Sequence, residues 1–439
     1  MSKNGLLLQP HVPVFFYIKH RNNHPKTHRP AMFNNLFFYH ALRAYIRFWH
    51  NVIFYRKVEI KNFPTDLAPN TPILIVTNHQ NTLMDALAVV LNVGARQPYF
   101  LTRADIFKKD FVRKLLMYLK MLPVYRLRDG MDEMQQNDEI FQMCVNILGA
   151  GGTLAAFPEG NHGVQYHLRP FKKGLARIAF KAETAHDWNL NLQILPCGLY
   201  YTNCQKMGEK LVVNFGEPFS VRDFKAEYEQ NQPRSLTQLT KRMSDEIKSK
   251  MLHFDDLPHH DTLKWLTDTE IRKEGDLTNN VLDKAKGLER LRQLNAETYT
   301  KRLEETKNLK HTLSKRGIEA EIYGQPKPSV FALVLQTLGL LLSAPVALYG
   351  WLNSVIPFSI PFYVTKKLKD KQFSSAIRLV LFALITFPFV WLIQWGIVLG
   401  FTDLKTSVLY ALSLPFTGYF AHRWARWWSE TLQLWKLRS

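Results

Sequence analysis

The sequence of 439 residues contains little cysteine and comparatively little negative charge. Its three cysteines, Cys144, Cys197 and Cys204, are too few for a disulfide framework and lack partners at the spacing of a metal site. We therefore expect reduced thiols in a cytosol-facing protein and no bound metal. The 37 acidic residues are outnumbered by 57 Lys and Arg, and this formal net charge of +20 favours an anionic partner: a nucleic acid, an acidic membrane or a phosphorylated substrate.

No signature of a nucleic-acid-binding module accompanies this charge, whereas long uncharged segments do. Residues 330–364 carry no charged side chain, a second apolar run covers 379–401, and 408–421 form a weaker one. The first two runs exceed the ~20 residues that cross a bilayer. The sequence therefore predicts an integral membrane protein with its membrane helices in 326–439, and a nucleic acid becomes the least favoured partner. A soluble bundle that buries these helices is the alternative.

The topology of the apolar runs depends on how often each one crosses the membrane. A single crossing by 330–364 would place the lysines within 366–371 opposite the rest of the chain, against the positive-inside tendency. Prolines at 345, 357 and 361 could instead break this run into a re-entrant or two-pass hairpin. Pairing 379–401 with 408–421 would likewise keep the basic residues that follow on the cytoplasmic face, where we expect the main soluble domain.

The N-terminal segments have distinct compositions. Residues 1–31 are rich in His, Pro and Asn but lack the basic start and cleavage site of a secretion signal, so we expect a disordered extension or a misassigned start before Met32. Residues 32–56 interleave aromatic and basic side chains in a helical pattern. This pattern suits a helix at the membrane interface, and a helix packed on a core is the alternative.

Short apolar runs typical of strands alternate with helical patterns between 57 and 225, which predicts an α/β domain. Residues 226–325 are more polar and predict two helices, 236–254 and 279–315, which form either a hairpin on the domain or an arm that contacts another protein. Within the domain, the expected strands are 57–61, 73–76, 98–102, 122–129, 153–157, 192–200 and 211–215, and the expected helices are 83–93, 105–119, 132–148 and 175–184.

His79 and Asp85 follow the buried strand at 73–76, where open α/β sheets usually build their sites. On a continuous helix their side chains would point ~120° apart, so the chain must turn between them if they are to meet. A cap by Asn81 or Thr82 would place Asp85 in the first helical turn, where its carboxylate can fix the tautomer of His79. The alternative is structural: Thr82-x-x-Asp85 resembles a capping box, with His79 as an ordinary loop residue.

Two further motifs are candidates for binding an anion. Arg126 and Arg128 alternate on one face of the strand predicted at 122–129, as phosphate ligands or as solvated charges. Glu159 and Gly160 follow the strand at 153–157 in a Gly-containing turn whose backbone N–H groups can face an anion, and a plain tight turn is the alternative.

These motifs occur in an order that resembles the glycerophospholipid acyltransferase family, and the resemblance covers residues 57–219. It implies a mixed sheet flanked by helices. His79 would be the catalytic base and Asp85 its orienting acid, Arg126 would bind the phosphate of the acceptor, Glu159 and Gly160 would take part in acceptor binding, and Pro196 would lie near the acyl chain. The four blocks that carry the resemblance are Asn78-His79…Asp85, Pro123-Val-Tyr-Arg126, Phe157-Pro-Glu159-Gly160 and Ile194-Leu-Pro196.

The sequence departs from the family pattern at two places. Five residues separate His79 from Asp85 instead of the usual four, a spacing that also resembles a subset of glycerol 3-phosphate acyltransferases. Asn161 and His162 stand where the third block usually continues with Thr and then Arg or Ser. Both departures bear on the choice of acceptor.

The resemblance implies a membrane-bound O-acyltransferase. It would move a fatty acyl group from an acyl thioester (acyl-CoA or acyl-ACP as co-substrate, with no other cofactor) to the free hydroxyl of 1-acylglycerol 3-phosphate. Arg126 would clamp the phosphate, with Arg128 or Lys172 as further candidates, and Glu159 would bind a hydroxyl or a neighbouring arginine. One alternative is a glycerol-3-phosphate acyltransferase, and another is an inactive relative that acts as a lipid-binding scaffold.

Overall fold

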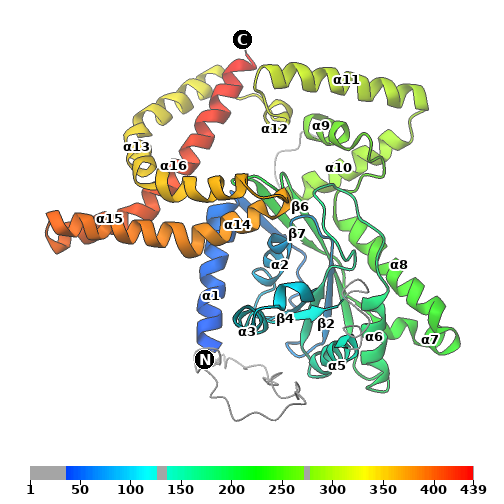
Figure 1. Cartoon of the computed structure of the whole chain (residues 1–439). Coiled ribbons are helices and arrows are strands. Elements are labelled where there is room, and N and C mark those ends of the chain that lie inside the picture. The colour runs from blue at the N-terminus through cyan, green and yellow to red at the C-terminus, as the bar shows by residue number, and fades with distance from the viewer. Residues whose placement is uncertain (1–35, 126–135, 271–276, 439) are drawn as a thin grey trace, which may run out of the picture.

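The computed structural model describes residues 36–125, 136–270 and 277–438, and a mixed sheet lies at the centre of the domain that contains His79 (Figure 1). The strand order is β1-β7-β6-β2-β5-β3-β4, and β8 pairs with β6. β6 is antiparallel to β7 and β8, and the other neighbours are parallel. The prediction of a mixed sheet flanked by helices is confirmed. The strands are β1 (Lys57–Lys61), β2 (Ile73–Thr77), β3 (Tyr99–Arg103), β4 (Met121–Val124), β5 (Thr153–Ala156), β6 (Gln193–Tyr201), β7 (Lys210–Phe215) and β8 (Phe219–Ser220).

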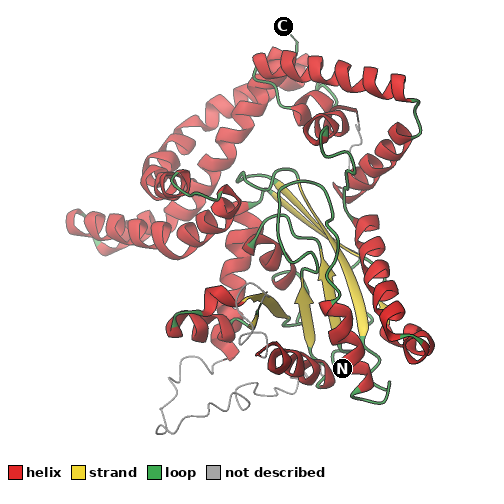
Figure 2. Cartoon of the chain, turned by 45° about the vertical axis from the view of Figure 1, so that its right-hand side comes forward, coloured by secondary structure: helices red, strands yellow, loops and turns green. Residues whose placement is uncertain are grey.

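Strand β2 is buried on both faces, which explains its continuous apolar run. Leu74 and Val76 belong to the core on one side of the sheet, and Ile73 and Ile75 belong to the core on the other. Figure 2 shows helices on both sides of the strands. The helices of the first core are α5 (Gln136–Gly149), α6 (Gly174–Thr184) and α8 (Gln232–Lys250), and those of the second are α2 (Leu83–Val90) and α14 (Ser374–Leu381).

The carboxyl ends of β2 and β5 lie side by side. The two strands run parallel, with Val76 opposite Ala156. Since parallel strands end at the same edge of a sheet, the loop that carries His79 and the loop that carries Glu159 leave the sheet next to each other.

The polar region after the sheet contains more helices than the sequence predicts. The single helix expected over 279–315 is wrong: one helix ends at Arg292 and the next begins at Ala296, where the Asn295 side chain caps it by accepting a hydrogen bond from Thr298 N at 2.8 Å. A helix, α9, also forms where none was expected. The expected helix over 105–119 is split as well, into η4 and α3. The remaining elements of these regions are η4 (Ala104–Phe107), α3 (Asp110–Tyr118), η6 (Val221–Phe224), α7 (Lys225–Gln230), α9 (His260–Glu270), α10 (Leu277–Arg292), α11 (Ala296–Lys315) and α12 (Ala320–Gly324).

The first described helix has two different halves. In α1 (Leu36–Phe48), the side chains of Phe37 and Phe48 are exposed. The helix continues as a π-helical segment, η3 (Trp49–Phe54), whose Trp49 and Phe54 are buried in the core beside β2. The alternative of a helix packed on a core therefore holds for the second half of this segment, and the interface helix stays a prediction for α1.

The first apolar run forms one long helix, α13 (Val330–Lys366), that continues through all three prolines. The prolines bend this helix instead of ending it. Figure 1 shows that both ends of α13 lie toward the rest of the molecule, with the bend on the outside. The second run forms η7 (Lys371–Phe373), α14, η8 (Phe382–Thr386) and α15 (Phe387–Phe401), and the weaker run lies within α16 (Leu404–Lys436).

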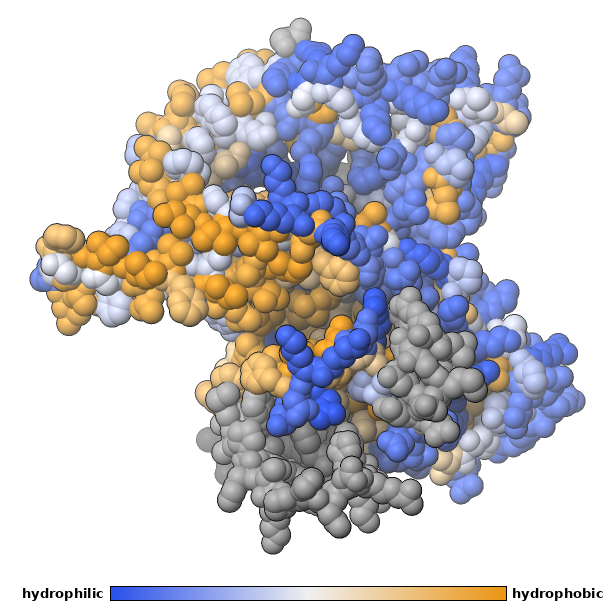
Figure 3. Space-filling view, in the orientation of Figure 1, coloured by the Kyte–Doolittle hydropathy of each residue, from blue (hydrophilic) through white to orange (hydrophobic). Residues whose placement is uncertain are grey.

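Two of these helices, Val330–Lys366 and Lys371–Phe401, are long and apolar enough to cross a membrane. Only 17% and 33% of their most apolar windows are buried, unlike the core helices of a soluble bundle. Figure 3 shows the hydrophobic surface as a band over these helices. Helices α13 and α16 cross closely at Gly350, where a Cβ atom would lie 2.0 Å from the carbonyl oxygen of Thr417, so only glycine allows this approach.

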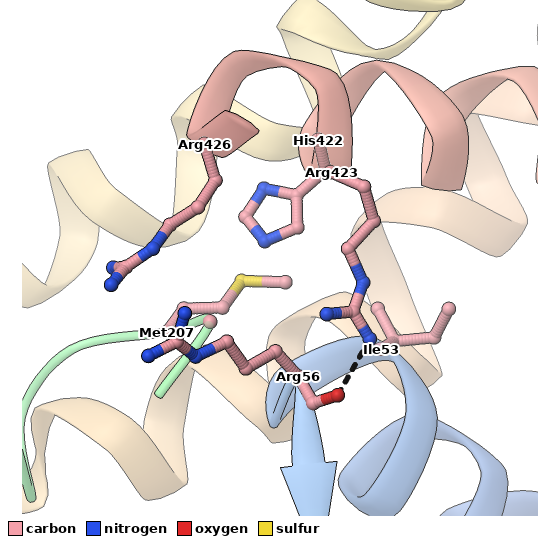
Figure 4. A pocket seen from close by; sticks show the side chains of 7 residues that line it. Ile53, Arg56, Met207, His422, Arg423 and Arg426 are labelled. Atoms are coloured by element: carbon pink, nitrogen blue, oxygen red, sulfur yellow. Dashed lines mark hydrogen bonds between the residues drawn. The ribbon is translucent and has the colours of Figure 1, made fainter. Parts of the chain in front are cut away.

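An ion-pair network joins the C-terminal helix to the domain that contains the sheet. Arg56 pairs with Glu321 and with Glu430, each at 2.9 Å, and Arg426 pairs with Glu430 at 2.8 Å and with Glu209 at 3.5 Å. Figure 4 shows the small pocket beside this network. Because both arginines already have carboxylate partners, we interpret the pocket as part of a structural junction. It is lined by Ile53, Arg56, Met207, Gly208, His422, Arg423 and Arg426.

Candidate active site

His79 and Asp85 meet across the turn between β2 and α2. Nδ1 of His79 lies 2.8 Å from Oδ2 of Asp85. The Asp85 side chain is fully buried, whereas the His79 side chain is 15% exposed. A carboxylate accepts, so Nδ1 donates its hydrogen and Nε2 is left with a lone pair. Among the described residues, Nε2 makes no hydrogen bond. The pair therefore has the geometry of a general base held in one tautomer.

Asp85 is the acceptor at the centre of the turn. Its Oδ2 atom also accepts hydrogen bonds from the backbone N–H groups of Gln80 at 2.8 Å and Asn81 at 2.6 Å. Its Oδ1 atom accepts from the hydroxyl of Tyr201 at 2.7 Å. Burial raises the pKa of Tyr201 well above its ordinary value, so this hydroxyl stays protonated as a donor. These donors compensate a buried negative charge.

Neither expected cap forms at the start of α2. The helix begins at Leu83 as predicted, but no side-chain hydrogen bond caps it at Thr82, and the Asn81 side chain donates to the Tyr55 hydroxyl at 3.3 Å. The capping-box alternative is also wrong, because the Asp85 carboxylate bonds to residues 80 and 81. Thr82 has a φ of 49°, which is unfavourable for a β-branched residue, and this left-handed residue makes the turn that brings His79 back to Asp85.

Glu159 supports the loop that holds His79. Its Oε1 atom accepts a hydrogen bond from the backbone N–H of His79 at 2.6 Å, and Oε2 accepts from Arg169 N at 3.1 Å and from Arg169 Nη1 at 3.3 Å. The carboxyl is buried, and burial raises its pKa to about 7 against these hydrogen bonds. Arg169 is thus the neighbouring arginine that the sequence led us to expect for Glu159.

The other residues predicted to bind the substrates are placed as follows by the structure. Gly160 has a φ of +69°, and a Cβ atom there would lie 3.7 Å from Cγ of Lys172, so exposed Lys172 flanks the same loop. Pro196 is buried within β6 opposite Val76, which is three residues before His79. Arg126 and Arg128 lie outside the described residues.

The His79 ring lies among aromatic rings. It stacks on Phe157 with ring centroids 3.9 Å apart and an interplanar angle of 9°. His162, which replaces the usual residue of the third block, lies perpendicular to it at 5.3 Å. The sequence did not identify Tyr201 or Phe157 as site residues, because only the pairing of β5 and β6 with β2 brings the carboxyl ends of these strands beside His79.

The first block is also tied to the neighbouring strand β6. The Asn78 side chain donates from Nδ2 to the carbonyl of Leu199 at 3.0 Å and accepts from Leu199 N at 2.7 Å. It thereby continues the hydrogen-bonding pattern of the sheet for one residue beyond β2. This bond fixes the chain immediately before His79.

Part of the sequence is similar to known acyltransferases. Residues 56–200 match the sequence model of the Acyltransferase family. The chain is 31% identical over 128 residues to glycerol-3-phosphate O-acyltransferase 2 of Saccharomyces cerevisiae, covering 29% of this chain and 17% of that protein. It is 28% identical over 138 residues to the chloroplastic 1-acyl-sn-glycerol-3-phosphate acyltransferase BAT2 of Brassica napus, covering 31% and 38%. The matches thus span well under half of these relatives.

A solved structure also resembles the chain in part. The 1-acyl-sn-glycerophosphate acyltransferase PlsC of Thermotoga maritima is 21% identical, with a TM-score of 0.33. The match covers 48% of this chain and 81% of that one.

Proposed function

Because residues 56–200 match the sequence model of the Acyltransferase family, we propose that the protein transfers a fatty acyl group from an acyl thioester to the free hydroxyl of 1-acylglycerol 3-phosphate. The observation that carries the proposal is the His79–Asp85 pair, with Nδ1 and Oδ2 2.8 Å apart and Nε2 without a partner among the described residues. A hydroxyl is a weak nucleophile at neutral pH, and such a base is what its attack requires.

In the proposed mechanism, His79 Nε2 takes the proton of the acceptor hydroxyl as the oxygen attacks the thioester carbonyl carbon. A C–O bond forms and a tetrahedral intermediate results. When the C–S bond breaks, the imidazolium returns the proton to the departing sulfur, which leaves as a thiol. General-base assistance of this kind contributes about 10²–10⁴-fold, and positioning supplies the rest. Buried Asp85 would stabilise the positive charge that His79 carries during the reaction.

Cationic side chains would bind the phosphate of the acceptor. Arg126 and Arg128 are proposed from the sequence. Among the described residues, Lys172 is the candidate, because it is exposed and flanks the loop at Gly160. Glu159 would act differently: its carboxyl oxygens already accept hydrogen bonds from His79 N and Arg169, so we assign it the task of fixing the loop of the base.

Glycerol 3-phosphate is the second candidate acceptor, favoured by the five-residue spacing between His79 and Asp85. The two are separated by incubating the purified full-length protein with labelled acyl-CoA or acyl-ACP and each acceptor, with His79→Ala as the control. Transfer to 1-acylglycerol 3-phosphate that disappears in His79→Ala supports the main proposal. Preferential transfer to glycerol 3-phosphate supports the second candidate. Equal transfer by His79→Ala and the natural protein contradicts the mechanism, and no transfer by either favours a lipid-binding scaffold.

We also propose that the protein is integral to the membrane, with its catalytic domain on the cytoplasmic face. The exposed apolar helices support this, as does the position of the basic residues that flank them. Arg423 donates from Nη2 to the carbonyl of Arg56 at 2.9 Å, so this end of the α16 apolar run lies at the catalytic domain. In this topology α15 and α16 form a hairpin whose turn at Asp403 is far from the domain, as Figure 1 shows for the turn between them.

A further inference from the structure

The connection between the two apolar segments contacts the candidate active site. In η7, the Oε1 atom of Gln372 accepts a hydrogen bond from Nδ1 of His162. The ring of Phe373 lies perpendicular to the His162 ring, with centroids 5.3 Å apart. His162 in turn lies 5.3 Å from the ring of His79. A continuous series of side-chain contacts therefore links His79, through His162, to a segment that lies 210 residues beyond His162 in the chain.

The helix that follows holds this connection firmly on the catalytic domain. The buried hydroxyl of Ser375 donates to the carbonyl of Cys204 at 2.7 Å, and Arg378 donates from Nη1 to the carbonyl of Gln205 at 2.9 Å. Ala376 and Leu379 belong to the same core as strand β2. Because α14 is built into the domain, the contact of Gln372 with His162 is part of the folded structure and not a chance approach of a surface loop.

The hydrogen bond determines the chemical state of His162. An amide oxygen can only accept, so His162 carries its hydrogen on Nδ1 when it bonds to Gln372. Burial lowers the pKa of His162, which favours the uncharged ring. An uncharged neighbour does not oppose the positive charge that His79 would acquire when it takes a proton, whereas a cation at the same distance would.

Resting on the proposed function, we infer that Gln372 and Phe373 are positioning residues of the active site, which act by holding His162 beside the catalytic base. The apolar C-terminal helices would thus complete the catalytic site in addition to anchoring it. Gln372 fixes the ring by its hydrogen bond, and Phe373 limits its rotation by packing against it.

The test measures kcat, and KM for each substrate, on the full-length protein in phospholipid nanodiscs. Gln372→Met keeps the volume of the side chain but removes the acceptor, and we expect kcat to fall about tenfold with KM of the acyl donor unchanged. Phe373→Ala should have a similar effect, and Phe373→Tyr, which keeps the ring, should restore most of the activity. Gln336→Ala, which removes a hydrogen bond between α13 and Thr431, is the matched control and should leave kcat unchanged.

A double-mutant cycle identifies the route of the effect. In a His162→Ala background, Gln372→Met should lower kcat no further, because its target is already absent. An equal loss in both backgrounds, or full activity of Gln372→Met alone, would overturn the inference. Failure of the proposed function looks different: the natural protein itself would then transfer no acyl group to any glycerophosphate acceptor.

Discussion

Replacing Asp85 by Asn should remove one charge from the active site while leaving its hydrogen bonds in place. Oδ2 of Asp85 accepts from three N–H groups, those of His79 Nδ1, Gln80 and Asn81. Only an oxygen can occupy that position, so the amide nitrogen of the Asn side chain must take the place of Oδ1. There it faces the hydroxyl of Tyr201, which can turn from donor to acceptor. His79 then keeps its tautomer.

The expected loss of activity follows from Coulomb's law. In the proposed mechanism His79 becomes positively charged with its ring nitrogen 2.8 Å from the carboxylate oxygen. For charge centres about 4 Å apart, an effective dielectric constant of 20 gives an attraction of about 4 kcal/mol. Losing it in the transition state should lower kcat by about 10²–10³-fold, the lower figure allowing for partial compensation by the remaining dipoles.

The assay is single-turnover acyl transfer from a labelled acyl thioester, with Asp85→Asn, Asp85→Ala and His79→Ala measured together. Asp85→Asn should retain measurable activity. Asp85→Ala should retain less, because the His79 imidazole also loses its hydrogen-bond acceptor, and His79→Ala should be the least active. An Asp85→Asn variant within threefold of the natural protein would show that the charge is not used. Equal activity of Asp85→Asn and Asp85→Ala would show that the acceptor at Oδ2 does not set the tautomer.

Three other outcomes are expected. Tyr201→Phe removes the hydrogen bond to the buried Asp85 carboxylate and should lower the free energy of unfolding by about 1.5–3 kcal/mol, measured by chemical denaturation; an unchanged value contradicts the contact. The pKa of Glu159 is raised from 4.5 to about 7, so the folded state binds its proton more tightly and its contribution to stability should disappear as pH rises from about 4.5 to about 7. Glu159→Gln should lack this slope, and parallel stability profiles would refute the assignment. Finally, the natural cysteines are buried, so a membrane-impermeant maleimide should report only on cysteines that are introduced. Lys369→Cys and Lys405→Cys should react from opposite sides of sealed vesicles, and reaction of both from the same side would contradict the α15–α16 hairpin.

The sequence predicted the centre of the site because its information is local. A buried strand, a turn and a short helix carry His79 and Asp85, and the structure places their side chains in contact. The way in which they meet was not predictable from capping rules, since the positive φ of Thr82 makes the turn. The roles of His79 and Asp85 in a reaction stay predictions until variants are measured.

The partners from distant segments could not be predicted in the same way. Tyr201 lies 116 residues after Asp85 and has no motif of its own, because its place depends on β6 pairing next to β2. Gln372 reaches His162 only through the docking of α14 on the domain. The existence of most strands and helices could be predicted from the periodicity of apolar residues. The break between Arg292 and Ala296 could not, because it lies within a long polar helical pattern and its only signal is the cap at Asn295.

The ion pairs at Arg56 have a consequence for biosynthesis. This residue directly precedes the first strand, yet one of its carboxylate partners, Glu430, is separated from it by 374 positions. A nascent chain therefore leaves the guanidinium without that partner until translation is nearly finished. The Arg56–Glu430 pair therefore forms last, and a chain that terminated before Glu430 would keep Glu321 as a carboxylate partner of Arg56 but lose the pair that ties α16 to it.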